Sequence, residues 1–185
     1  MTITWIILGI MAIIVLWLIA TFNGLIRSRN RVDEAWSDIE VQLKRRYDLI
    51  PNLVNTVKGY AGHEKQLFEN ITAARSEAMS ATLPADKLQK ENMLSGALRQ
   101  LFAVAENYPD LKANQNFLSL QGDLTDTENK IQAARRFYNG NVRDLNTKLQ
   151  VFPTNMIAGM LNFKPREFFD IDEKGPEGQP VEVKF

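Results

Sequence analysis

An uninterrupted apolar run near the N-terminus constrains this chain more than any other feature. The 20 residues from Ile3 to Phe22 carry no ionisable side chain, and only threonines interrupt them with polar groups. At 1.5 Å per residue, a helix of this length spans about 30 Å, the thickness of a bilayer's hydrocarbon core. Trp5 and Trp17 lie towards its two ends, where indole rings favour the membrane interface. We therefore expect a transmembrane anchor over residues 1–26.

A cleavable signal peptide is the main alternative to a retained anchor. Such a peptide has a basic n-region, a shorter apolar stretch and a cleavage site of the small-x-small type. Nothing basic precedes Ile3, the run is too long, and Leu18-Ile19-Ala20 matches a cleavage site poorly. These features favour an anchor that stays in the protein.

The charges that follow the apolar run predict its orientation. Arg27, Arg29 and Arg31 come directly after it, whereas only the terminal amine precedes it. Arginine and lysine are enriched on the cytoplasmic side of membrane spans. We therefore expect the N-terminus outside and the body of the chain in the cytoplasm.

The remaining composition excludes several classes of function. The chain has 22 Lys and Arg against 22 Asp and Glu, so its formal net charge is zero and no basic footprint for nucleic acid is expected. It has no cysteine, which excludes disulfides, thiol nucleophiles and cysteine-ligated metal sites.

Beyond the anchor, helical spacing dominates and strand signals are nearly absent, which predicts an all-α fold. The first signal that could end a helix lies at Asp48 to Pro51. We favour a break there, in which Asp48 caps a new helix whose first turn holds Pro51. The alternative is one long helix kinked at Pro51. One helical face precedes this point: Val32, Trp36, Ile39, Leu43 and Tyr47.

A second helix is expected over about 51–81. Gly59 and Gly62 interrupt it, but Val57, Glu64 and Ile71 keep a seven-residue step across them. We therefore interpret the glycines as points of close approach between helices, not as a hinge.

Two further helices are expected over about 85–107 and 112–150, separated by turn signals at Pro84 and Pro109. Repeated seven-residue spacing with short connections predicts an antiparallel four-helix bundle over residues 27–151. The last helix is the most regular, with apolar residues every seven positions: Phe117, Leu124, Ile131, Tyr138 and Leu145.

The antiparallel order places the segment after Gln150 at the membrane-proximal end of the bundle. Residues 152–172 are unusually apolar, and Thr154 or Asn155 can cap a short turn there. These side chains either close the end of the bundle or contact lipid or a partner. Residues 173–185 are expected to form a flexible tail.

Several segments of the chain together form a recognisable pattern. They are Ala35-Trp36, Val41 to Val54 (VQLKRRYDLIPNLV), Val57 to Ala61, His63-Glu64, Glu106 to Ala113, Asn116-Phe117, Leu120-Gln121, Tyr138-Asn139 and Phe152-Pro153. With these segments the chain resembles the LemA family, from the anchor to about Phe169. The resemblance implies a bacterial, single-pass protein of the inner membrane with a short outer N-terminus, a cytoplasmic helical bundle and no established biochemical activity.

No grouping of reactive residues predicts catalysis or metal binding. His63 is the one histidine, and position 67 is leucine, so the His-Glu-x-x-His zinc signature is absent. Neither a Gly-x-Ser-x-Gly elbow nor a glycine-rich phosphate loop is present. We expect no catalytic, cofactor-binding or metal-binding residue, no cofactor, and a structural or exposed role for His63.

Charged residues within or beside the apolar stripes are expected to pair across helices, because an unpaired buried charge costs several kcal/mol. Glu64 and Arg46 occupy core positions, and Arg75 and Glu128 flank them. Truncating Glu64 is then expected to destabilise the fold by roughly 3–5 kcal/mol. The cluster Lys44-Arg45-Arg46 is interpreted as a solvated face with an i,i+4 pair between Lys44 and Asp48.

These features predict a non-enzymatic scaffold or adaptor whose partners are the lipid bilayer and other copies of the chain. The alternative is an accessory subunit of a membrane peptidase or another membrane machine, which requires a membrane-protein partner. No small-molecule substrate is evident.

Overall fold

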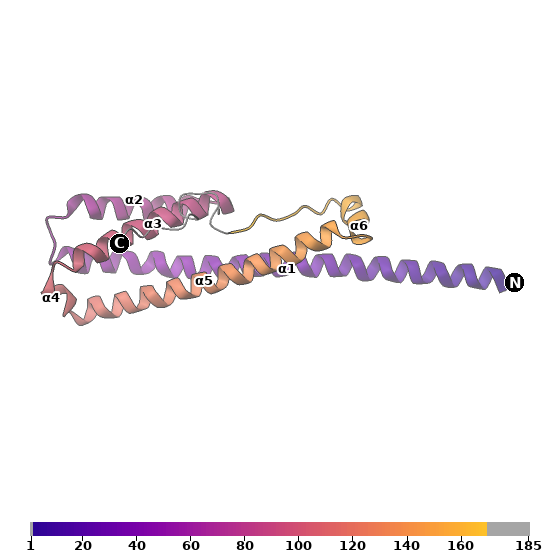
Figure 1. Ribbon diagram of the computed structural model, residues 1–185, viewed down its shortest axis with the longest axis horizontal. Helices are drawn as coiled ribbons and strands as arrows, with labels where there is room; N and C mark the ends of the chain where they lie inside the picture. Colours follow the sequence, from indigo (N-terminus) through magenta and orange to yellow (C-terminus); the bar gives the residue numbers. More distant parts are fainter. Residues whose placement is uncertain (1, 170–185) are drawn as a thin grey trace, which may run out of the picture. The chain divides into compact units, whose positions relative to one another are not determined.

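The computed structural model describes residues 2–169, and these residues form helices joined by short connections (Figure 1). The expected all-α class is therefore confirmed for the described part of the chain, including a long apolar helix at the N-terminus. The tail expected over residues 173–185 lies outside the described residues. The helices are α1 (Thr2–Lys58), α2 (Lys65–Ser80), α3 (Pro84–Ala105), α4 (Pro109–Lys112), α5 (Gln115–Gln150) and α6 (Thr154–Met160).

The described residues divide into two units. The first comprises residues 2–37 and 136–168, and the second comprises residues 38–135 together with Phe169. Helices α1 and α5 each contribute to both units, so each unit is described by itself below.

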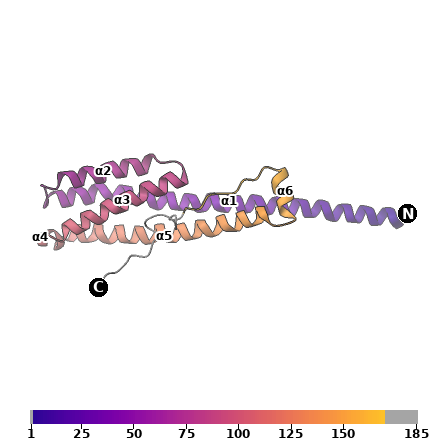
Figure 2. The same ribbon diagram turned by 45° about the horizontal axis from the view of Figure 1, so that its top comes forward.

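Helix α1 contains the apolar run. Among the described residues it is the one helix long and apolar enough to cross a membrane, and none of its most apolar stretch is buried. In both ribbon views the N-terminal part of α1 extends past α6 without a neighbouring segment (Figures 1 and 2). An apolar surface of this size needs a solvent other than water, and a bilayer provides one.

Helix α1 does not break at Pro51. It continues through the proline to Lys58, so the expected new helix at Asp48 is wrong and the alternative of one long helix holds. Proline has no N–H to donate to the carbonyl four residues earlier, which here belongs to Tyr47. The Nε of Arg75 on α2 donates to this carbonyl oxygen at 2.8 Å. A tertiary hydrogen bond thus replaces the missing helical one, which is why the break is unnecessary.

Replacing Arg75 with alanine is expected to destabilise the second unit by about 1–3 kcal/mol, because the Tyr47 carbonyl then has no donor. The matched background is Pro51→Ala, which restores the helical N–H. In this background, Arg75→Ala should lower the free energy of unfolding by less. Urea unfolding of the unmodified chain, the two single variants and the double variant, followed by circular dichroism, measures this difference in the cost of Arg75→Ala. Equal costs in both backgrounds would show that Arg75 does not act through Tyr47.

The expectation of one helix over 51–81 is also wrong, because residues 59–64 form the connection between α1 and α2. Gly59 and Gly62 lie in this connection. A Cβ at either glycine would meet only backbone oxygens from the last residues of α1, a few positions earlier in the chain, so the glycines are not points where another helix approaches closely. Ala61 is completely buried there, and its N–H donates to the Val57 carbonyl at 2.9 Å. The seven-residue step across the glycines does not reflect a continuous helix.

Apolar side chains from α1, α2, α3 and α5 form the core of the second unit, and the ribbon views show α2 and α3 side by side (Figures 1 and 2). The expected stripe on α5 is confirmed across both units, since all five of its members are buried. Asn114 precedes α5, and its Oδ1 accepts from the N–H of Phe117 at 3.1 Å, which caps the helix. The buried residues of the second unit's four long helical segments include Leu43, Leu53, Val57, Phe68, Ile71, Leu94, Leu101, Phe117, Leu124 and Ile131.

Candidate functional site: a buried charged cluster and an apolar surface

Arg46 is the centre of a buried charged cluster in the second unit. It lies on the core face of α1 and is only 3% exposed. Its Nη1 donates to Glu128 of α5 at 2.7 Å and to the Ser95 hydroxyl of α3 at 3.1 Å, and its Nη2 donates to Glu91 of α3. One guanidinium therefore connects three helices, as the core position of Arg46 predicted.

Tyr47 completes the cluster from the next position of α1. Its hydroxyl donates to the Glu91 carboxylate and, at 3.2 Å, to the carbonyl of Ala78 at the end of α2. Burial and then the hydrogen bond to Glu91 raise the pKa of Tyr47 far above its ordinary value. The phenol therefore stays protonated and serves as a hydrogen-bond donor, not as a base.

Glu91 is the member of this cluster that sequence reasoning missed. It is 5% exposed and receives donors from Arg46 and Tyr47. The sequence does contain a signal for its burial. Glu91 lies three residues before Leu94 and seven before Leu98, so it continues their apolar stripe on α3 towards the N-terminus. A buried glutamate in line with leucines indicates a cationic partner.

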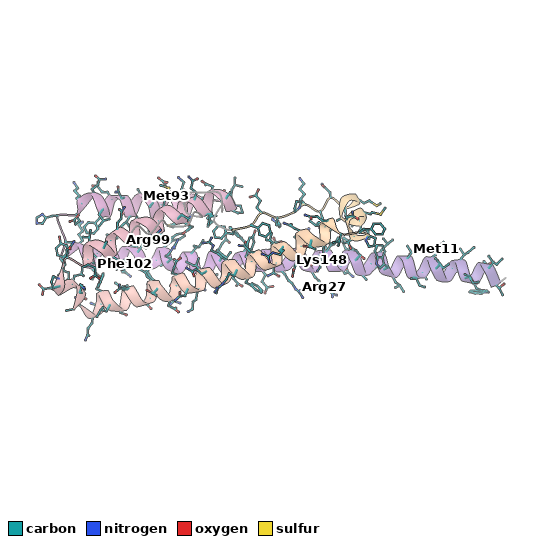
Figure 3. The ribbon with its side chains drawn as sticks, in the orientation of Figure 1. Met11, Arg27, Met93, Arg99, Phe102 and Lys148 are labelled. Atoms are coloured by element: carbon teal, nitrogen blue, oxygen red, sulfur yellow. The ribbon has the colours of Figure 1, made fainter. Side chains whose placement is uncertain are left out.

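A cavity of about 420 Å³ adjoins the cluster, within the size range of ligand pockets. Arg46, Glu91 and Glu128 line it, together with Arg99 and Phe102, which are labelled on α3 in Figure 3. Both carboxylates in its wall are bound to Arg46. Glu91 is therefore poorly suited to accept a proton from a substrate, since that would break a buried ion pair, whereas Glu128 is partly exposed.

The basic cluster beside Arg46 is not the uniform solvated face that we expected. Arg46 is buried, whereas its neighbour Arg45 is about half exposed and lies 3.9 Å from Asp123 and 3.7 Å from Asp126 of α5. In the part of the chain that the structure describes, Lys44 and Asp48 form no ion pair.

Glu64 does not pair in the core. It is half-buried at the N-cap of α2, in the connection described above, and has no ion pair among the described residues. The expected cost of roughly 3–5 kcal/mol for its truncation therefore no longer follows. His63 beside it is exposed. Over residues 2–169, no three metal-ligating side chains are grouped as a metal ion would need.

The first unit presents a different feature, an apolar surface around α6. Ile157, Met160 and Leu161 line a hollow of about 350 Å³ together with residues of α1 from Leu18 to Phe22. The N-cap of α6 is Pro153, without a side-chain cap, so neither Thr154 nor Asn155 has the expected capping role. Contact with α1 instead holds this short helix, with Ile157 and Ala158 as its buried residues.

An extended segment after α6 is fastened by side chains of α1 and α5 within the first unit. Asn146 exchanges two hydrogen bonds of 2.9 Å with the backbone of Arg166, and Tyr138 donates to the Glu167 carbonyl at 2.9 Å. The Arg166 guanidinium donates to Asp33 at 2.6 Å. Since side chains satisfy its backbone, this segment needs no strand partner.

Together these features define a helical protein with an N-terminal apolar helix and an interior charged cluster whose members bind one another. The chain belongs to the LemA family, whose pattern matches residues 35–185.

Named relatives agree with this assignment. Protein LemA of Metamycoplasma hominis is 30% identical over 155 residues, which cover 82% of this chain and 69% of that protein. Magnetosome protein MamQ 2 of Paramagnetospirillum magneticum is 24% identical over 190 residues, which cover 89% of this chain and 69% of that protein. Magnetosome protein MamQ 1 of the same organism has the same identity and coverage.

Proposed function

We propose that this chain is a membrane-anchored scaffold or adaptor that acts through contacts of its helical body. Helix α1 crosses the bacterial inner membrane, with its N-terminus outside. The second unit lies in the cytoplasm as an antiparallel four-helix bundle that binds other copies of the chain or a membrane-protein partner.

One observation carries this proposal: the charged groups around Arg46, in the interior of the second unit, are engaged with one another. Arg46 binds both Glu91 and Glu128, and Tyr47 donates to Glu91. Groups held in this way fix the register of helices and do not supply a reactive acid or base. The similarity to proteins named LemA and MamQ supports a non-catalytic role at a membrane.

The second unit also carries large apolar side chains on its surface. Val41 of α1 is 62% exposed, and Met79 of α2 and Leu118 of α5 are each 51% exposed. Exposed apolar residues on several helices offer contact points for a partner or for a second copy.

Single-cysteine photocrosslinking in native membranes tests this proposal. The chain has no cysteine of its own, so Val41→Cys, Met79→Cys or Leu118→Cys each gives one defined attachment point for a photoreactive probe. We expect at least one position to capture a protein reproducibly. The matched control is Lys44→Cys, an exposed position on a charged part of α1.

The identity of the captured protein distinguishes the two forms of the proposal. Adducts with a second copy support a self-assembling scaffold, and adducts with one other membrane protein at fixed stoichiometry support an accessory subunit. Capture of no protein above the Lys44→Cys control at all three positions would contradict a function based on contact.

A further inference from the structure

An uncharged segment surrounds α6. From Leu149 to Phe163 the sequence contains no ionisable side chain, while Lys148 and Lys164 flank it on either side. Apart from the N-terminal run, this segment is the longest stretch of the sequence without a charged side chain. An uncharged stretch between lysines suits a position at a membrane interface, where the cations remain among headgroups.

The contacts of α6 place it at one end of the apolar run. Its hollow is shared with Leu18, Ile19 and Phe22, the last residues of that run. The ring of Phe163, just after α6, meets the ring of Phe22 edge-on with centroids 6.5 Å apart. At 1.5 Å per residue, Leu18 lies about 6 Å along the axis from Phe22. When the run crosses a bilayer, α6 therefore lies in the outermost part of the hydrocarbon and in the headgroup layer.

Apolar side chains of α6 and of the turn before it are also exposed. Met156 and Met160 are four residues apart on α6, which places them on one face, and they are 60% and 85% exposed. Phe152, in the turn before the helix, is 79% exposed. Amphipathic interfacial helices bury their apolar face by about 5–10 Å in a bilayer, a depth that includes the position of α6.

Cations gather at the same level of the first unit. Lys148 of α5 donates to the Ser28 hydroxyl of α1 at 2.6 Å, and Arg27 directly precedes Ser28 in the sequence. The Arg29 guanidinium lies 5.9 Å from the centre of the Phe163 ring. Basic residues beside an interfacial apolar segment attract anionic headgroups.

We propose that Phe152 and α6 insert into the leaflet next to the helical body, and that phospholipid acyl chains cover their exposed face. The inference rests on the membrane anchor of the proposed function but not on the scaffold. The chain then holds the membrane at two points, α1 across it and α6 along its surface. This double attachment fixes the angle and rotation of the first unit at the bilayer, which a single span does not do.

Lipid is favoured over a protein as the occupant because the exposed face of α6 continues from the membrane-crossing surface of α1. The face is also small for a protein partner, since stable interfaces use about 20–30 residues on each side. Its outward apolar residues number only a few.

Spin-label accessibility in the full-length protein tests this inference. Three methionines give matched single-cysteine variants in a chain without cysteine: Met11→Cys in the span, Met160→Cys on α6 and Met93→Cys on α3. Met11 and Met93 are labelled in Figure 3 and are 55% and 50% exposed, so both labels report a free surface. Each labelled protein is reconstituted as one copy per nanodisc of mixed neutral and anionic phospholipid. Its collisions with oxygen and with a water-soluble nickel chelate are then measured.

We expect the ratio of oxygen to nickel accessibility at position 160 to be several-fold above that at position 93 and below that at position 11. A ratio equal to that at position 93 would overturn the inference, since the face would then be in water. Shielding from both reagents in single-copy discs would overturn it as well, because protein would then cover the face. Neither result bears on the scaffold, which the crosslinking experiment tests separately.

Discussion

Replacing Arg46 with alanine is expected to lower the free energy of unfolding of the second unit by about 3–5 kcal/mol, because Glu91 would remain buried without its cation. Arg46 is 3% exposed and binds carboxylates from two other helices. Denaturant unfolding of the full chain in detergent micelles, followed by circular dichroism, measures the loss.

The neighbouring arginine provides the control for this substitution. Arg45 lies near two carboxylates of α5 at the surface, so Arg45→Ala should cost no more than about 1 kcal/mol. A double replacement, Arg46→Met with Glu91→Leu, should recover much of the stability, since it removes both buried charges. If Arg46→Ala were no more harmful than Arg45→Ala, the cluster would not hold the helices together.

Replacing Leu124 with alanine is expected to destabilise the second unit by about 2–5 kcal/mol, because the removed atoms leave a cavity in a packed core. Leu124 is 5% exposed and belongs to the seven-residue stripe of α5. Leu118 is a leucine of the same helix that is 51% exposed, and its replacement should change stability by about 0.5 kcal/mol or less. Thermal unfolding of the two variants compares them directly.

A similar loss of stability for the two leucine variants would contradict the assigned face of α5. It would mean that Leu118 is also buried, for example against a second copy. Repeating the comparison over a range of protein concentrations separates that case, because stability supplied by association depends on concentration.

The regular apolar patterns of the sequence predicted the helices and their inner faces well. The stripe on α5 was correct at every member because one face of a long helix is buried along its whole length. The core position of Arg46 followed from the same periodicity. Periodic burial leaves a repeated signal that a single sequence is sufficient to show.

The errors arose where a contact between distant residues decides the local structure. A proline inside a helix normally ends or bends it, but α1 continues through Pro51 because Arg75, far along the chain, donates to the Tyr47 carbonyl. Gly59 and Gly62 were assigned to a helix because Val57, Glu64 and Ile71 kept a seven-residue step across them by coincidence. Local propensity contains no information about such long-range partners.

In the candidate sites, too, features with a repeated local pattern were predicted and those set by long-range contacts were not. Half of the charged cluster was predicted, since Arg46 and Glu128 were recognised as charges at or beside core positions, whereas Glu91 was missed. The apolar character of residues 152–169 was evident in the sequence. The antiparallel order also predicted its place at the membrane-proximal end. Its particular contacts with Leu18, Ile19 and Phe22 were not predicted, because they join residues far apart in the sequence.

The membrane anchor and the lipid contacts of α6 both require that α1 remains part of the mature protein and holds it in the membrane. The most direct measurement is intact-mass analysis of the protein after alkaline carbonate washing of native membranes, with the soluble fraction analysed in parallel. We expect the washed membranes to retain the chain with the Ile3–Phe22 run present. A chain cleaved near Leu18-Ile19-Ala20 and recovered in the soluble fraction would contradict the anchor, and with it the membrane contacts proposed for α6.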